Sequence, residues 1–61
     1  MKRRDLIRHL LQHGCVYIRE GSNHTIYANP AILRSSPIPR HRELNEKIAR
    51  KICHDLKIPP P

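Results

Sequence analysis

The chain has 61 residues, with twelve Lys and Arg against five Asp and Glu, so its formal net charge is +7. A chain this short forms a single small domain and buries only about 60% of the surface that its unfolded form would expose. Two cysteines are too few for the disulfide framework of a small secreted protein, which favours reduced thiols. No apolar run approaches the roughly 20 residues that span a bilayer, and charge interrupts the N-terminal segment too early for a signal peptide. We therefore expect the protein to stay in the cytoplasm.

The strong positive charge favours a polyanionic partner, either nucleic acid or an anionic membrane surface. Binding to a membrane surface would require a basic helix with bulky apolar side chains that can insert. The chain contains no Trp and no Phe. Nucleic acid is therefore the favoured partner.

The first predicted element is a helix over residues 2–13. Four apolar residues have the spacing of a helix that buries one side, namely Leu6, Ile7, Leu10 and Leu11. Gly14 follows this stripe and is typical of the residue that ends a helix in the left-handed conformation.

Two strands with an intervening turn are predicted next. Apolar and polar residues alternate in "CVYIR" and "HTIYA", as in half-buried strands. A three-residue loop at positions 20–22 would place Ile18 opposite His24 and Val16 opposite Ile26, so that the apolar residues share one face. This register predicts that His24 lies on the core side, at the end of the sheet.

A third strand is predicted in "LRSSPIP", after a turn at Asn29 and Pro30. Ile38 would point inward. Pro37 and Pro39 lack the N–H group that a central strand needs, so they confine this strand to an edge of the sheet.

A second helix completes the predicted domain. Asn45 is a suitable N-cap, and Glu46 adds an acidic residue to the first turn. The apolar stripe of this helix consists of Ile48, Ala49, Ile52, Cys53 and Leu56. Because each helix has one apolar side and the sheet has one apolar face, both helices should cover the same face of an antiparallel sheet. The sequence thus predicts a two-layer α+β domain of order α-β-β-β-α over residues 1–58, followed by a Pro-rich tail at residues 59–61.

A metal site is one alternative to be weighed. His9 and His13 are four residues apart on the first helix, a spacing that suits a zinc pair, and Cys15, Cys53 and His54 could supply further ligands. The helix lacks the Glu of an HExxH motif, however, and no tightly spaced Cys or His motif supports a metal. The position of His13 in a last helical turn is favourable for the helix dipole alone.

The cysteines are also weak candidates for nucleophiles. Cys53 lies on the apolar stripe, where a free cysteine usually behaves as a small hydrophobic residue. Cys15 is expected at a strand edge and somewhat more open, but no base is identified beside it. Inert structural thiols are the simpler interpretation.

Basic residues cluster at three places, "KRR" at the start, "PRHR" at positions 39–42, and the polar side of the second helix. Any single Lys or Arg is most simply part of a solvated face. The cluster of Arg40, His41 and Arg42 just before a helix is more telling, since the N-terminus of a helix attracts anions. We expect contacts with phosphate in this region, which would position a nucleic acid without reading its sequence.

His24 has two interpretations. A lone histidine on an apolar face is usually a core residue that bonds to nearby backbone. His24 follows a Gly-Ser-Asn turn at the end of the sheet, however, where one face of its ring could meet solvent while the other is packed. Partial burial beside positive charges would favour the neutral imidazole that a general base requires. RNA would need little more than this base, because its 2′-hydroxyl is an internal nucleophile, whereas DNA lacks that group.

Four segments resemble one known family, the HicA toxins, which are small mRNA-cleaving partners of the HicB antitoxins. These segments are "MKRRDLIRHLLQHG", "GSNHTIY", "IPRH" and "IARKICHDLKI", in the order found in the family. The resemblance implies a fold like that of the double-stranded RNA-binding domain, a catalytic histidine at His24, and an antitoxin that covers the active face. In many members a histidine directly follows the Gly-Ser pair, where this chain has Asn23. His41 matches the second motif, and we expect it to bind phosphate or support the site, with the role of catalytic acid as a lesser alternative.

These observations together predict a toxin that cleaves mRNA as an endoribonuclease, with His24 as the general base and neither metal nor cofactor. The residues expected to contact RNA are Ser22, Asn23, Arg40, His41, Arg42 and Lys47. A binding module that grips RNA without cutting it would use the same fold and charge. A DNA-binding or adaptor protein ranks last, because no recognition helix is evident.

Overall fold

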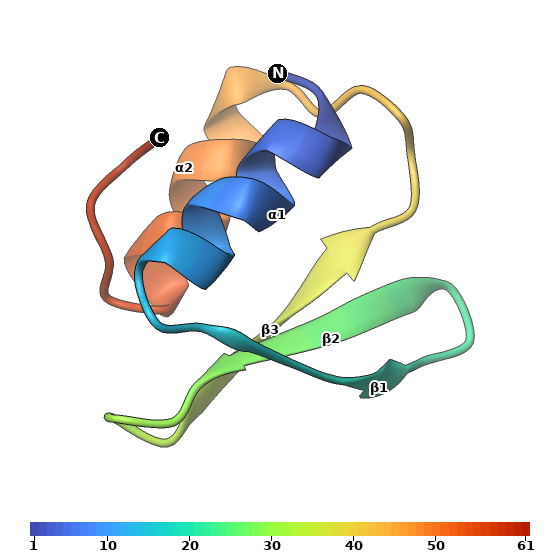
Figure 1. The fold of residues 1–61 in the computed structure, drawn as a ribbon. Coiled ribbons are helices and arrows are strands. Elements are labelled where there is room, and N and C mark those ends of the chain that lie inside the picture. The colour runs from blue at the N-terminus through green and yellow to red at the C-terminus, as the bar shows by residue number, and fades with distance from the viewer.

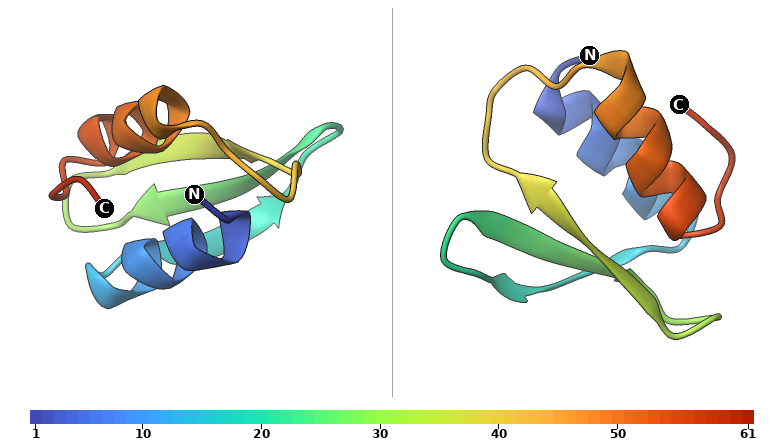
Figure 2. Two further views of the ribbon diagram at one scale, coloured as in Figure 1. Left: turned by 90° about the horizontal axis from the view of Figure 1, so that it is seen from above. Right: turned by 180° about the vertical axis from the view of Figure 1, so that it is seen from behind.

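The computed structural model describes residues 1–61 as two helices and three strands. Their order is α1 (Arg3–Gln12), β1 (Val16–Glu20), β2 (His24–Asn29), β3 (Arg34–Pro39) and α2 (Glu46–Asp55) (Figure 1). The strands form an antiparallel sheet in the order β1-β2-β3, so β3 is an edge strand as predicted. Both helices cover the same face of the sheet (Figure 2). The predicted α+β architecture is confirmed.

Neither helix has the length and apolar character that crossing a membrane requires.

A Schellman motif at Gly14 ends α1. Gly14 has φ of +85°, a conformation that a residue without Cβ adopts at little cost. The N–H of Cys15 donates to the carbonyl of Leu10 at 3.0 Å, and the N–H of Gly14 donates to that of Leu11 at 3.2 Å. These bonds satisfy the last carbonyls of the helix and turn the chain toward β1. The predicted glycine stop is therefore confirmed.

Side-chain and backbone caps also define α2. Asn45 Oδ1 accepts a hydrogen bond from the N–H of Ile48 at 2.9 Å, which confirms the predicted N-cap. At the other end the N–H of Ile58 donates to the carbonyl of Cys53 at 3.0 Å. Lys57 occupies the left-handed position of this second Schellman motif, with φ of +56°.

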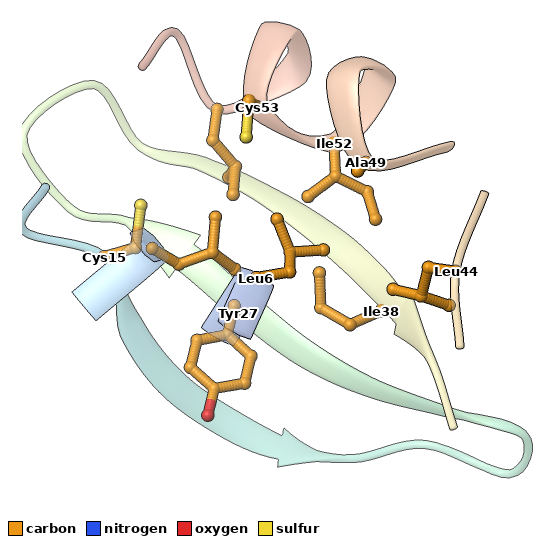
Figure 3. Close-up of a cluster of buried hydrophobic side chains, with 10 residues drawn as sticks. Leu6, Cys15, Tyr27, Ile38, Leu44, Ala49, Ile52 and Cys53 are labelled. Carbon is orange, nitrogen blue, oxygen red and sulfur yellow. The ribbon is translucent and has the colours of Figure 1, made fainter. Parts of the chain in front are cut away.

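A thin apolar core fills the space between the helices and the sheet (Figure 3). Ten buried residues form it: Leu6, Leu10, Cys15, Tyr27, Ile38, Leu44, Ala49, Ile52, Cys53 and Leu56. Ile38 points inward as predicted and is completely buried. Leu11 was predicted to lie on the buried side of α1, but its side chain is 54% exposed because the core spans only one narrow face of that helix.

The β1–β2 hairpin carries a β-bulge that the sequence did not predict. Val16 pairs with Ala28 and Arg19 pairs with Ile26, and the shift of register between these pairs leaves Ile18 as the extra residue. A bulge changes the phase of the side-chain alternation, so apolar residues before and after it no longer share a face. The predicted pairing of Val16 with Ile26, and of Ile18 with the first residue of β2, is therefore wrong.

The helices cover the opposite face of the hairpin from the one predicted. Thr25, Tyr27 and Asn29 are buried toward the helices, whereas His24 is exposed and Ile26 is half-buried. Thr25 and Asn29 can be buried because their side chains have hydrogen-bond partners within the protein. Since neighbouring residues of a strand point to opposite faces, His24 lies on the open face of the sheet. The prediction that His24 belongs to the core side is wrong.

Candidate nucleic-acid interface

The β1–β2 turn carries three of the predicted site residues, Ser22, Asn23 and His24, all of them exposed. The N–H of Gly21 donates to the carbonyl of His24 at 2.6 Å and closes the turn. A Cβ atom at Gly21 would lie 3.2 Å from that same carbonyl oxygen, closer than side chains normally approach. A glycine here therefore lets the turn close tightly, directly before the exposed histidine.

Arg40, which directly follows β3, forms hydrogen bonds to this turn across the end of β2. Its Nε and Nη2 atoms donate to Glu20 Oε1 at 3.1 and 2.9 Å. Nη2 also donates to the carbonyls of Gly21 and His24, and Nη1 donates to the carbonyl of Ser22 at 3.2 Å. Arg40 was predicted to hold phosphate. In the structure its guanidinium instead donates hydrogen bonds to the protein itself, to Glu20 and to the turn that carries His24.

The carboxylate of Glu20 links this turn to α1. Thr25 Oγ1 donates to Glu20 Oε1 at 2.9 Å and accepts from Arg3 Nη2 at 2.7 Å. Arg3 Nε donates in turn to the carbonyl of Pro39 at 2.9 Å. The hydrogen bond from Thr25, followed by those from Arg40, lowers the pKa of Glu20 below its ordinary value. A continuous network of charged and polar groups therefore connects α1, all three strands and the turn.

A cleft of about 270 Å³ lies between the start of α1 and the segment that follows β3. These two segments run side by side in the structure, where the N–H of Arg3 donates to the carbonyl of Arg42 at 2.9 Å (Figure 1). All five residues that line the cleft are basic, namely Lys2, Arg3, Arg4, Arg40 and Arg42. The cleft is thus a site of concentrated positive charge, and it shares Arg40 with the turn that carries His24.

The remaining predicted residues lie outside this cleft. His41 is exposed in the loop between β3 and α2, and Lys47 is exposed in the first turn of α2. The lining of the cleft therefore includes Arg40 and Arg42 but neither His41, which lies between them in the chain, nor Lys47.

Two groups of residues in this region were not among the predicted site residues. Lys2, Arg3 and Arg4 line the cleft, and their basic run was visible in the sequence. Glu20 and Thr25 form the network beneath the turn, but they left no such signal, because their contact depends on the bulged register of the hairpin.

The histidine and cysteine residues considered for metal binding do not assemble into a site. The rings of His9 and His13 lie 4.5 Å apart, and His9 Nε2 lies 2.7 Å from the carbonyl of Pro59. No three His, Cys, Asp or Glu side chains come together as metal ligands would. Cys15 was expected to be somewhat open but is 2% exposed, and burial raises the pKa of the Cys15 and Cys53 thiols. Both thiols are therefore held in the unreactive protonated form.

Comparison with known proteins identifies the family. The family model described as the HicA toxin of bacterial toxin-antitoxin systems matches residues 3–58, which include both helices and all three strands. No curated protein and no solved structure matches the chain. Membership of this family implies a toxin whose partner is an antitoxin. The chain belongs to the HicA family of bacterial toxins.

Proposed function

We propose that this toxin is an endoribonuclease that cleaves mRNA in the cytoplasm without a metal ion, with His24 as its general base. The observation that carries the proposal is the placement of His24, which is exposed on a turn held by Arg40, while Arg40 also lines the basic cleft. An accessible imidazole on a turn whose backbone is bonded to a guanidinium suits a reaction in which a phosphodiester gains negative charge.

The reaction follows from the chemistry of RNA. The His24 imidazole removes the proton of a 2′-hydroxyl, and the 2′-oxygen attacks the adjacent phosphorus. The bond from phosphorus to the 5′-oxygen of the next nucleotide then breaks, and that oxygen takes up a proton from a general acid or water. The products are a 2′,3′-cyclic phosphate and a 5′-hydroxyl. Cationic side chains stabilise the phosphorane through its negative charge.

The remaining RNA contacts come from both sides of His24. Ser22 and Asn23 offer polar groups from the same turn, and Arg42 offers a charge from the cleft. His41, which lies between Arg40 and Arg42, and Lys47, in the first turn of α2, are also exposed and can contact phosphates of a longer RNA. Most of these contacts involve the sugar-phosphate backbone, so they position the RNA without selecting its sequence.

The test is to incubate the purified protein in EDTA with a single-stranded RNA and with DNA of the same sequence. The proposal predicts that the RNA is cut, that the DNA is left intact, and that the new RNA ends are a cyclic phosphate and a 5′-hydroxyl. RNA that is bound but stays intact would instead identify a non-catalytic RNA-binding module. Cleavage that stops in EDTA, or ends that carry a 5′-phosphate, would contradict the proposed chemistry.

A further inference from the structure

We infer that the basic cleft is a separate subsite for an RNA phosphate that is not cleaved. This phosphate would neighbour the scissile one, at which His24 acts as the base. This inference rests on the proposed function and extends it to Lys2, Arg3 and Arg4. The cleft of about 270 Å³ is lined by five basic side chains and no acidic one, and Arg40 alone among them is closely paired with a carboxylate, that of Glu20. Such a concentration of positive charge is unfavourable in the free protein and becomes favourable when an anion enters.

Two of the basic side chains that line the cleft are held in place by hydrogen bonds within the protein. Arg3 is held by its bonds to Thr25 and Pro39, and Arg40 by its bonds to Glu20 and the turn. These bonds shape the walls of the cleft before a ligand arrives, which lowers the entropic cost of binding.

The other three side chains are free to close on a ligand. Lys2 and Arg42 make no side-chain hydrogen bond or ion pair within the protein. Arg4 is 72% exposed, and its ion pair is with Asp5 at 4.0 Å. Their positive charges therefore remain largely uncompensated. Arginine and lysine are the usual ligands of nucleic-acid phosphates, with arginine able to bind two oxygens at once.

The start of α1 adds a further attraction for an anion. Lys2 is the N-cap of this ten-residue helix, and its side chain makes no capping hydrogen bond. The N-terminus of a helix bears a partial positive charge, so it strengthens the field of the side chains around it. Because the N–H of Arg3 is bonded to the carbonyl of Arg42, the helix end would act on a phosphate through its field and not through that N–H.

The position of the cleft indicates a neighbouring phosphate and not the scissile one. The cleft lies between the start of α1 and the segment that follows β3, whereas the His24 side chain is exposed on the face of the sheet that the helices leave open. His24 pairs with Pro39 across the β2–β3 ladder, and Arg40 follows Pro39 directly. An RNA strand that crosses this end of the sheet would thus place one phosphate at His24 and another in the cleft.

Binding without cleavage is the first test. The probe is a fluorescent 2′-O-methyl RNA, which cannot be cut because its nucleophile is blocked. A Lys2→Gln/Arg4→Gln protein should bind roughly tenfold more weakly, and its affinity should depend less steeply on salt concentration. The matched control is Arg50→Gln/Lys57→Gln, which loses the same charge from α2 and its C-terminal end, outside the cleft. Equal weakening of both proteins would indicate a general charge effect and would overturn the subsite.

Cleavage of a modified substrate is the second test. The substrate is a DNA strand with a single ribonucleotide as the point of cleavage and one uncharged methylphosphonate, moved stepwise along the strand. One position should lower kcat/KM of the wild type roughly tenfold and have little further effect on the Lys2→Gln/Arg4→Gln protein. If the methylphosphonate lowers kcat/KM of the Lys2→Gln/Arg4→Gln protein as much as it lowers that of the wild type, the cleft does not contact that phosphate. If the wild type cuts no substrate, the proposed function fails, whereas the binding test still decides whether the cleft holds phosphate.

Discussion

Arg40 and Glu20 are joined by hydrogen bonds of 2.9 and 3.1 Å although they belong to opposite edges of the sheet, one following β3 and the other ending β1. Strand β2 lies between those edges, and its first residue, His24, accepts a further hydrogen bond from Arg40 through its carbonyl. The hydrogen-bonded pair of Arg40 and Glu20 therefore acts as a clamp that closes the end of the sheet around the residue proposed as the base. Any change that loosens the pair should change how His24 is presented.

Replacing Arg40 with lysine tests this clamp, because lysine keeps the charge but cannot make the same forked set of hydrogen bonds. The variant should remain folded, because exposed ion pairs contribute little to stability and lysine keeps the charge. Hydrogen exchange of the Gly21 amide should accelerate, and kcat should fall by about tenfold or more because the base is less well positioned. Wild-type kcat together with faster exchange would show that the clamp does not position His24.

Glu20→Gln should change how stability depends on pH. The pKa of Glu20 is lowered in the folded protein by Thr25 and Arg40, so its contribution is complete above the ordinary value of 4.5 and is lost as the pH falls below it. The free energy of unfolding should therefore differ most between the two proteins at neutral pH, and the difference should shrink in acid. Urea unfolding from pH 7 to pH 3 measures it. A difference that stays constant would show that the carboxylate charge contributes nothing.

Asn29→Ala should destabilise the fold. Asn29 Nδ2 donates a buried hydrogen bond of 2.8 Å to the carbonyl of Leu56 and so ties the end of β2 to the end of α2. Its loss leaves a buried carbonyl unpaired, at a cost of about 1–3 kcal/mol, and in a domain of this size each kcal/mol lowers Tm by about 4–8 °C. Asn23→Ala is the control, since Asn23 is exposed and should change stability by less than about 0.5 kcal/mol. Similar melting curves for both variants would contradict the assigned role of Asn29.

The two Schellman motifs predict opposite effects for opposite substitutions. Lys57 has φ of +56°, so Lys57→Gly should relieve its backbone and raise stability by up to about 1 kcal/mol. Gly14 has φ of +85°, and a Cβ atom there would meet no other atom within 4 Å, so Gly14→Ala should cost about 1–2 kcal/mol through the backbone alone. Thermal unfolding compares both with the wild type. A stabilised Gly14→Ala protein, or a destabilised Lys57→Gly protein, would refute this account of the helix ends.

Local patterns predicted the elements well. The stop at Gly14, the N-cap at Asn45 and the inward Ile38 depend on residues close in sequence or on the spacing of apolar side chains, and the structure confirms all three. The proline residues of β3 correctly indicated an edge strand, because a missing N–H is a property of the residue itself.

The face of the hairpin could not be predicted in the same way. The bulge at Ile18 shifts the alternation by one residue, and the buried Thr25 is stabilised by partners that lie far away in the chain, Arg3 among them. For the same reason the sequence did not reveal the role of Arg40 as a clamp or the contact between Glu20 and Thr25. These features depend on tertiary register, whereas the basic character of the region was visible from the local runs of Lys and Arg in the sequence.

The central claim is that His24 acts as the base, and the kinetics of His24→Ala test it most directly. The exposed side chain can be removed without creating a cavity, so the variant should have the same circular dichroism spectrum and melting temperature as the wild type. His54→Ala, which removes an exposed histidine from the last turn of α2, is the matched control. We predict that His24→Ala still binds a 2′-O-methyl RNA but cleaves RNA at least about 10²-fold more slowly, as expected for loss of a general base, while His54→Ala cleaves normally. Wild-type cleavage by folded His24→Ala would contradict the account.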